Sequence, residues 1–210
     1  MNTAKTKSKI NLLGLSHQEL TDFFISIDEK PFRATQIIKW VHQRGISDIS
    51  EMTDLSKSLR EKLLADCEIK APEVVYEKLS KDGTKKWVIK AGEKDLIEMV
   101  LIPEKNRATL CVSSQVGCAV DCSFCATGKQ GFSRNLSLDE IIGQVWVAAN
   151  SFGLPREPNS RHITNVVMMG MGEPLLNFEP VVNAMNLMTD DNAYGLSKRK
   201  VTLSTSGIVP

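Results

Sequence analysis

The spacing of apolar residues changes twice along this 210-residue chain. Between about Ser16 and Asp66, apolar residues recur every three or four positions, which is the period of a helix buried on one face. Between Glu73 and Ile102 they form short runs separated by turn residues, which is typical of β-strands. In the rest of the chain, strand-like runs alternate with helical stretches. We therefore predict an α/β chain with a helical module at 1–72, a β extension at 73–106 and a β-α core at 107–210.

Three helices are expected in the helical module. The first follows Ser16, which stands three residues before Glu19 in the S-x-x-E pattern of a capping box. A second helix follows Pro31, and a leucine-rich helix ends near residue 66. The residues expected to face inward are Leu20, Phe23, Phe24, Ile27, Ile37, Ile38, Val41, Leu55, Leu59, Leu63 and Leu64.

Strand signals fill the remainder. Residues 74–76 and 87–89 flank Asp82-Gly83, a strong hairpin signal, and residues 96–102 form a third apolar run. In the core we expect strands at 109–113, 163–169 and 201–204, with helices at 138–149 and about 180–188. Strands that alternate with helices pair in parallel, so we expect parallel β-α units. Only two helices follow the three core strands, so this β-α series is expected to be incomplete.

Composition excludes some classes of protein and identifies no partner. Apolar residues make up 42% and charged residues 24% of the chain, which excludes wholesale disorder. The 26 basic and 25 acidic residues nearly cancel, so nucleic-acid affinity would have to come from local patches. No apolar run approaches the length of a membrane span or a signal-peptide core. We expect a cytoplasmic chain that does not enter the membrane.

Three of the five cysteines lie within eight residues, as Cys118-x3-Cys122-x2-Cys125. An odd number of clustered cysteines argues against a disulfide framework. Three thiolates on one loop can hold three irons of a cubane cluster and leave the fourth iron open to a substrate. Structural zinc is the competing interpretation, but it needs a fourth ligand, and the three histidines of the chain show no paired spacing. Coincidentally buried cysteines are a third possibility.

A glycine-rich segment follows the second core strand. Gly170-Met171-Gly172-Glu173 places flexible backbone before a carboxylate that can accept hydrogen bonds from an ammonium group. Ser204 stands at the end of the third core strand. The alternatives are an ordinary loop with a solvated glutamate, and a serine that only fills a loop.

The cysteine loop, with Phe124 before its last cysteine and a predicted strand before its first, resembles the radical S-adenosylmethionine (SAM) superfamily. The resemblance implies that residues 107–210 form the first half of a (β/α)6 partial barrel, incomplete at its C-terminal end. It implies a [4Fe-4S] cluster whose free iron chelates the amino and carboxylate groups of SAM. The implied cluster ligands are Cys118, Cys122 and Cys125, and the implied SAM contacts are Gly172, Glu173 and Ser204.

Longer stretches narrow the resemblance to the dual-specificity RNA methyltransferases, which act on C2 of adenine in large-subunit ribosomal RNA and in transfer RNA. A related adenine C8 methyltransferase is an alternative, although the complete N-terminal helical module favours C2. A non-catalytic RNA-binding or zinc-binding fragment is an alternative of another class. The stretches that carry the resemblance are residues 97–103, 111–118, 131–136, 169–174 and 201–207.

The resemblance also implies a radical mechanism. Adenine C2 is not nucleophilic, so direct polar transfer of a methyl group fails. In the family, the methyl group is first placed on a protein cysteine, and the protein–RNA adduct is later resolved with formation of a disulfide. Glu98 matches the family's proton acceptor and Cys111 the cysteine that resolves the adduct. No cysteine follows Cys125 to match the methyl carrier, so we expect these 210 residues to be truncated and not to methylate RNA alone. Cys67 has no counterpart and is expected to be structural.

The implied partners are ribosomal and transfer RNA and a reductant such as flavodoxin or ferredoxin, and we expect a monomer. Local cations could neutralise phosphates, and exposed aromatic rings could stack on an unpaired, flipped-out base. The candidate cations are Lys81, Lys85, Lys86, Lys90, Lys94, Lys129, Arg134, Lys198, Arg199 and Lys200. The candidate aromatic residues are Trp40, Trp87 and Phe132, of which Trp40 is also expected in the core.

Overall fold

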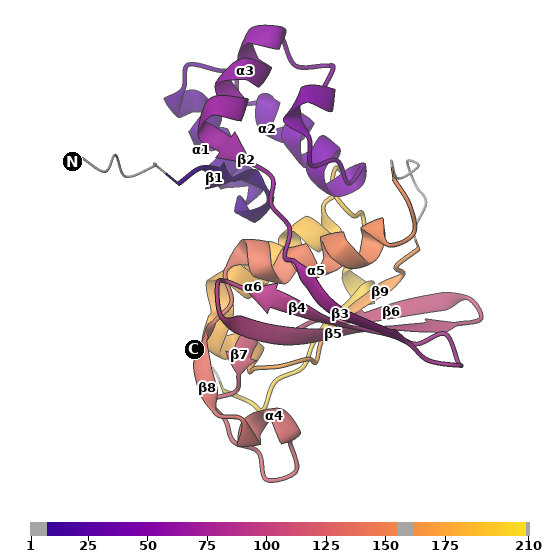
Figure 1. The fold of residues 1–210 in the computed structure, drawn as a ribbon. Coiled ribbons are helices and arrows are strands. Elements are labelled where there is room, and N and C mark those ends of the chain that lie inside the picture. The colour runs from indigo at the N-terminus through magenta and orange to yellow at the C-terminus, as the bar shows by residue number, and fades with distance from the viewer. Residues whose placement is uncertain (1–7, 155–161, 209–210) are drawn as a thin grey trace, which may run out of the picture.

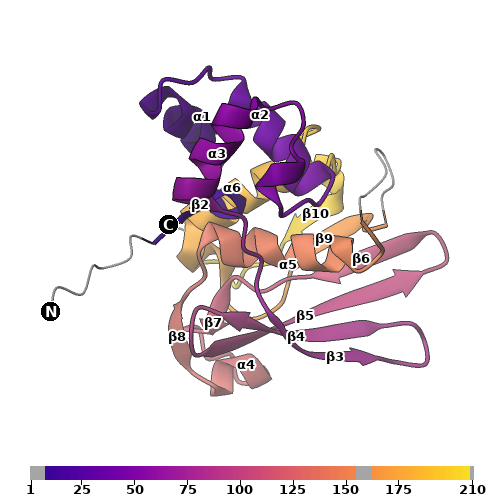
Figure 2. The same cartoon turned by 45° about the horizontal axis from the view of Figure 1, so that its top comes forward.

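The computed structural model describes residues 8–154 and 162–208, which form a six-stranded sheet, a layer of helices on one of its faces and a helical module beyond those helices (Figures 1 and 2). The strand order is β10-β9-β6-β5-β4-β3. The α/β class predicted from the sequence is confirmed. Within the described residues, no helix is long and apolar enough to cross a membrane.

The N-terminal module contains three α-helices held by a short parallel strand pair. Its helices are α1 (His17–Ser26), α2 (Arg33–Ile38), which continues as a π-helical turn at Lys39–Gln43, and α3 (Lys57–Asp66). Strands β1 (Ile10–Asn11) and β2 (Cys67–Glu68) pair at the two ends of the module. The predicted capping box is confirmed, because Glu19 N donates to Ser16 Oγ (3.3 Å) and Ser16 N donates to Glu19 Oε2 (2.8 Å).

Two of the predicted inward leucines are placed differently by the structure. Leu55 is buried but lies before the first residue of α3, and Leu64 is 41% exposed. Successive helical residues point about 100° apart around the axis, so a helix that buries Leu59 and Leu63 turns Leu64 toward solvent. Phe23 and Ile27 of the first helix pack only partly buried against the core. The other predicted positions are buried.

The central sheet combines an antiparallel half and a parallel half. Strands β3 (Val74–Leu79), β4 (Lys85–Ala91), β5 (Asp95–Glu104) and β6 (Arg107–Cys111) pair antiparallel, and the Asp82-Gly83 hairpin is confirmed. Strands β9 (Asn165–Met168) and β10 (Val201–Leu203) continue the sheet in parallel with β6. Helices α5 (Leu138–Asn150) and α6 (Phe178–Thr189) make the connections, as the alternating pattern predicted.

The two faces of this sheet differ in what covers them. On β5, Ile97, Met99 and Leu101 are buried toward the helices, whereas Glu98 points the other way and is exposed. Residues that face each other in neighbouring strands share a side of the sheet. The face away from α5 and α6, called the open face below, therefore carries Val88, Glu98, Val100, Cys111, Val167 and Thr202.

The helical module is fastened to the helix layer, on the side of α5 and α6 away from the sheet (Figure 1). Trp146 Nε1 donates to Val41 O (2.9 Å), and Asn150 Nδ2 donates to Gly45 O (3.0 Å). Buried residues of the module and of the sheet form one continuous apolar core. The open face and the module therefore lie on opposite sides of the molecule.

Candidate functional site

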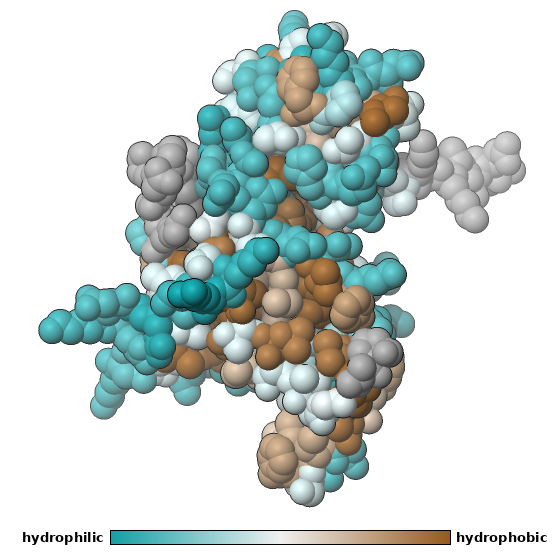
Figure 3. All heavy atoms as spheres, turned by 180° about the vertical axis from the view of Figure 1, so that it is seen from behind, coloured by the Kyte–Doolittle hydropathy of each residue, from teal (hydrophilic) through white to brown (hydrophobic). Residues whose placement is uncertain are grey.

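The three clustered cysteines lie on a lobe that projects from the end of β6 (Figure 1). Strands β7 (Gln115–Gly117) and β8 (Phe132–Asn135) pair antiparallel and close it, and helix α4 (Ala126–Lys129) lies between them. Residues 115–135 are called the cysteine lobe below. The sequence predicted only a loop here, because elements of three or four residues are too short to show a period. Seen from behind, apolar surface gathers between this projection and the N-terminal module (Figure 3).

Gly117 fixes the point at which the chain enters the cysteine lobe. Its φ of +73° favours glycine, and an added Cβ would overlap the carbonyl oxygen of Gly131. The amide of Cys118 donates to that same oxygen (3.0 Å). A side chain at position 117 would therefore push apart the two strands that carry the loop.

The thiols of Cys118, Cys122 and Cys125 are free and half-buried. The amide of Cys125 donates to Cys122 O (3.0 Å), and Lys129 Nζ contacts Asp121 Oδ1 (2.9 Å) across the loop. In residues 8–154 and 162–208, no three His, Cys, Asp or Glu side chains are gathered as metal ligands. Three soft thiols on one closed loop fit an iron–sulfur cluster in kind and number. In this structure the three thiols do not converge on one point.

Buried polar side chains hold the base of the cysteine lobe. Ser113 N donates to Gln144 Oε1 and Gln144 Nε2 donates to Ser113 O, both at 2.8 Å. Asn177 Nδ2 donates to Ser114 O and to Leu136 O, also at 2.8 Å. Sequence reasoning missed Gln144 and Asn177, since their only signal is an amide at a position that folding buries.

Arg134 joins the returning strand of the lobe to two other elements. Its guanidinium donates to both carboxylate oxygens of Glu140 on α5 and to Asp95 on β5, all at 2.8 Å. Burial raises the pKa of Glu140, but hydrogen bonds from Arg134 and Ser137 outweigh burial and bring this pKa below its ordinary value. The hydrogen bonds to Glu140 raise the pKa of Arg134. Arg134, whose side chain is 36% exposed, therefore anchors β8 to β5 and α5, and its role as a phosphate contact stays a prediction.

The glycine-rich segment packs against the chain that leads to the cysteine lobe. A Cβ at Gly170 would lie 2.7 Å from Val112 O, and one at Gly172, whose φ is +101°, would lie 2.5 Å from Gln115 Cβ. The amides of Ser114 and Gln115 donate to Met171 O at 2.8 and 3.1 Å. Close approach of residues 112–115 thus accounts for both glycines, together with the positive φ at Gly172.

Glu173 is 4% exposed and receives hydrogen bonds from its own chain. Leu175 N donates to Oε1 (3.1 Å), and Ser206 donates to Oε2 through its N (2.8 Å) and its Oγ (2.9 Å). Burial raises the pKa of Glu173. Hydrogen bonds from Ser206, Thr205 and Leu175 lower this pKa by more than burial raises it, so it lies below its ordinary value. Ser204 is exposed and follows β10. Gly172, Glu173 and Ser204 thus lie just beyond the carboxyl ends of neighbouring parallel strands, where α/β sheets bind ligands.

Glu98 and Cys111 lie on the open face, on adjacent strands. Glu98 Oε1 contacts Lys86 Nζ at 2.7 Å, and half of each side chain is exposed. Cys111 pairs with Val100 and is half-buried, and burial raises the pKa of its thiol. In the N-terminal module, burial raises the pKa of the Cys67 thiol to about 11, as expected for a structural residue. All five cysteines are free, so the disulfide expected from the family resemblance is not supported.

Two of the predicted base-stacking residues are buried. Trp87 is 1% exposed and donates to Glu77, and Trp40 is 9% exposed and donates to Asp54, so a stacking role for either is wrong. Their indole N–H groups donate to carboxylates of exposed residues at the edge of the core, which lets these large rings enter it. Phe132 is 47% exposed, and Lys85 is held by Glu77 beside the Trp87 ring.

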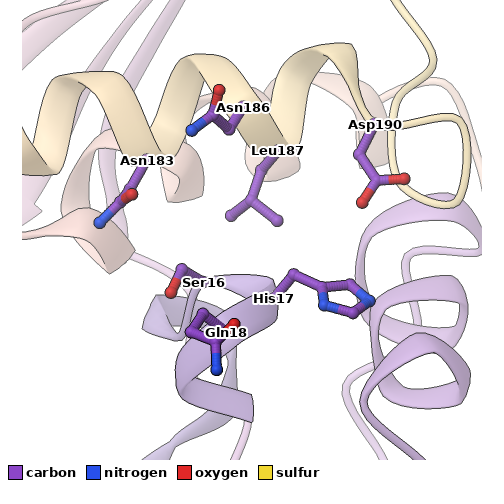
Figure 4. Close-up of a pocket in the computed structure, with 7 residues that line it drawn as sticks. All are labelled: Ser16, His17, Gln18, Asn183, Asn186, Leu187 and Asp190. Atoms are coloured by element: carbon purple, nitrogen blue, oxygen red, sulfur yellow. The ribbon is translucent and has the colours of Figure 1, made fainter. Parts of the chain in front are cut away.

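A polar cavity of about 290 Å³ lies between the first turn of α1 and helix α6, as Figure 4 shows. None of the predicted cluster, SAM or catalytic residues lines it. The candidate chemistry is therefore not in this cavity. The lining residues are Ser16, His17, Gln18, Asn183, Asn186, Leu187 and Asp190.

Two family models match the chain. Residues 10–69 match the ribosomal RNA large subunit methyltransferase N-terminal domain, and residues 112–210 match the radical SAM superfamily. The chain is 66% identical over 205 residues to the dual-specificity RNA methyltransferase RlmN of Marinomonas sp. (strain MWYL1), covering 96% of this chain and 55% of that protein. The corresponding protein of Marinobacter nauticus is 62% identical, with 96% and 54% covered. The chain thus spans about half the length of the curated relatives it matches.

A solved structure also matches. The crystal structure of a radical SAM methyltransferase from Sphaerobacter thermophilus superimposes with a TM-score of 0.81 at 35% sequence identity. The match covers 95% of this chain and 57% of that one.

Gly117→Ala should weaken the cysteine lobe more than Gly131→Ala does. Both glycines have a left-handed φ, which costs alanine about 1–2 kcal/mol, but only the Cβ at 117 meets backbone. Overpacking adds about 1–3 kcal/mol. Urea unfolding gives the stabilities, and alkylation of Cys118 reports opening of the lobe. Equal effects of the two substitutions would contradict this account of Gly117.

Arg134→Gln should destabilise the protein by about 1.5–3 kcal/mol, the range for hydrogen bonds to charged groups. The matched control is Arg107→Gln, because Arg107 and Glu104 form an exposed pair, expected to contribute about 0–1 kcal/mol. The lowered pKa of Glu140 means that its contribution is present above the ordinary value of 4.5 and is lost as the pH falls through the lowered pKa. Acid titration of urea stability should show less of this loss in Arg134→Gln, and an unchanged profile would refute the assignment.

Proposed function

Since the chain belongs to the radical SAM family of the dual-specificity RNA methyltransferases, we propose that it serves the methylation of C2 of adenine in large-subunit ribosomal RNA and in transfer RNA. The observation that carries this proposal is the packing of the glycine-rich segment against the base of the cysteine lobe. The amides of Ser114 and Gln115 bind Met171 O, so the loop with the thiols and the loop with Glu173 are directly joined. That arrangement suits a cluster and a ligand that touch each other.

In this proposal, Cys118, Cys122 and Cys125 hold a [4Fe-4S] cluster. The bound cluster supplies the electron that cleaves SAM, a chemistry suited to a carbon that is not nucleophilic. Gly172 and Glu173, beyond β9, and Ser204, beyond β10, hold SAM at the adjoining strand ends. Gly117 and Arg134 keep the lobe closed around the ligands.

Glu98 and Cys111 act on the nucleotide at the open face. The Glu98 carboxylate accepts the proton lost by the methylated adenine, and the ammonium of Lys86 orients one of its oxygens. Cys111 takes part in releasing the protein–RNA adduct. An adenine can reach these groups only when it leaves its stack, so the substrate is a flipped-out or unpaired nucleotide.

RNA contacts follow from the cations and rings that the fold leaves accessible. Lys86 and Lys90 each lie two residues from Val88 on β4. Residues two apart in a strand point to the same side, so both lysines belong to the open face with Glu98. Phe132, on the cysteine lobe, is exposed enough to stack on a base. We further propose that the protein is a cytoplasmic monomer reduced by a flavodoxin or ferredoxin.

Anaerobic reconstitution with iron and sulfide tests the cluster. The unvaried chain should bind about four irons with broad visible absorbance, and SAM with a reductant should then release deoxyadenosine. Single alanine substitutions at Cys118, Cys122 or Cys125 should abolish both, whereas Cys67→Ala should retain the irons because Cys67 lies in the N-terminal module. Stoichiometric zinc without visible absorbance would reject the radical function in favour of a zinc-binding domain.

Lys90→Gln should lower RNA affinity and reduce the slope of log affinity against log salt by about 0.7 to 1, because one phosphate contact is lost. Lys57→Gln on α3 is the control, since Lys57 is a highly exposed lysine on the far side of the molecule. Binding is measured by fluorescence anisotropy with an RNA stem-loop that carries an unpaired adenine. Equal slopes for the two variants would exclude this part of the open face from the RNA interface.

A further inference from the structure

The loops that follow strands β9 and β10 are connected by one buried carboxylate. Glu173 follows the glycine-rich segment after β9, and both hydrogen bonds to its Oε2 come from Ser206, three residues beyond the end of β10. Its Oε1 accepts from Leu175 N, which caps the short helix at Pro174–Asn177. With 4% of its surface exposed, Glu173 has little water to replace these partners.

The number of acceptor positions limits what else this carboxylate can bind. An ionised carboxylate offers about four lone-pair sites. Leu175 N, Ser206 N and Ser206 Oγ occupy three of them. About half of the hydrogen-bonding capacity of Glu173 therefore holds the loop that contains Ser204, and about one site is left for a further donor.

The backbone of Glu173 is held by the base of the cysteine lobe. Its amide donates to Gln115 Oε1 (2.9 Å), and Gln115 Nε2 donates to Asn135 Oδ1 (2.8 Å) on the returning strand of the cysteine lobe. One chain of hydrogen bonds thus runs from the lobe through Gln115 and Glu173 to Ser206. Movement of the loop after β10 would therefore reach Glu173 and, through Gln115, the cysteine lobe.

We propose that Ser206 is a positioning residue for SAM, acting through Glu173. The hydroxyl and amide of Ser206 hold the loop after β10 against Glu173, and this contact, called the clasp below, fixes the position of Ser204 relative to Gly172. This inference rests on the proposed function, in which Gly172, Glu173 and Ser204 bind SAM. Ser206 would position those residues without contacting SAM itself. Loss of the clasp releases the loop after β10 from the loop after β9. The residues proposed to contact SAM are then unchanged but no longer held together.

The affinity for SAM gives the first test. SAM binding to the reconstituted chain is measured by equilibrium dialysis for the unvaried chain, Ser206→Ala, Ser206→Thr and Ser197→Ala. Ser206→Ala should weaken binding about tenfold, and Ser206→Thr, which keeps the hydroxyl, should recover most of it. Ser197 is the matched control, because it is exposed and precedes the same strand without a side-chain hydrogen bond in the described part of the chain. Equal affinities of Ser206→Ala and Ser197→Ala would overturn the proposal.

Hydrogen exchange gives a second test that needs neither cluster nor SAM. The amides of Ser206 and Leu175 both donate to Glu173, so Glu173→Gln should make both exchange at least several-fold faster. Ser197→Ala should leave them unchanged, and circular dichroism checks that each variant is folded. Unaltered exchange in Glu173→Gln would show that the clasp does not exist. If the unvaried chain bound no SAM, the proposed function and the SAM role of Ser206 would both fail, while the exchange result would still decide whether the clasp exists.

Discussion

The segment at residues 112–115 leaves strand β6 with its backbone buried, and buried backbone groups need hydrogen-bond partners. Its partners come from three directions: Gln144 on helix α5, Asn177 before helix α6, and the glycine-rich segment at Met171. The cysteine lobe begins where this segment ends. The position of the thiols relative to the sheet therefore depends on the side-chain amides of Gln144 and Asn177 in the helix layer.

These same contacts explain why the two candidate ligand loops adjoin. The glycine-rich segment can reach the base of the lobe because Gly170 and Gly172 have no side chains to obstruct it. Glu173 then lies in a water-poor position, where unmade hydrogen bonds are costly, and it takes its donors from the loop after β10. Packing of the two glycines against residues 112–115 thus determines which polar groups become neighbours.

Local patterns predicted helices and hairpins well where residues close together in sequence specify the element. The capping box at Ser16 and the Asp82-Gly83 turn depend on neighbours in sequence, and both are confirmed. Local patterns did not predict the partners of two side chains that suit either RNA or the protein itself. Trp87 is aromatic and Arg134 is cationic, and either property suits RNA as well as the interior. Their partners, Glu77 and two acidic residues, lie on other elements, at separations of 10, 39 and 6 residues.

Periodicity, turn residues and the spacing of three cysteines are properties of the chain alone, so they were enough to predict the α/β class, the order of the longer helices and strands, and the family resemblance. Which polar groups are used internally depends on the tertiary structure. The tertiary structure placed Glu98 and Cys111 on one open face, paired Arg134 with Glu140 and Asp95, buried Glu173, and set the helical module on the opposite side. Burial and hydrogen-bond partnership arise where separate helices and strands meet, so no pattern within one element specifies them.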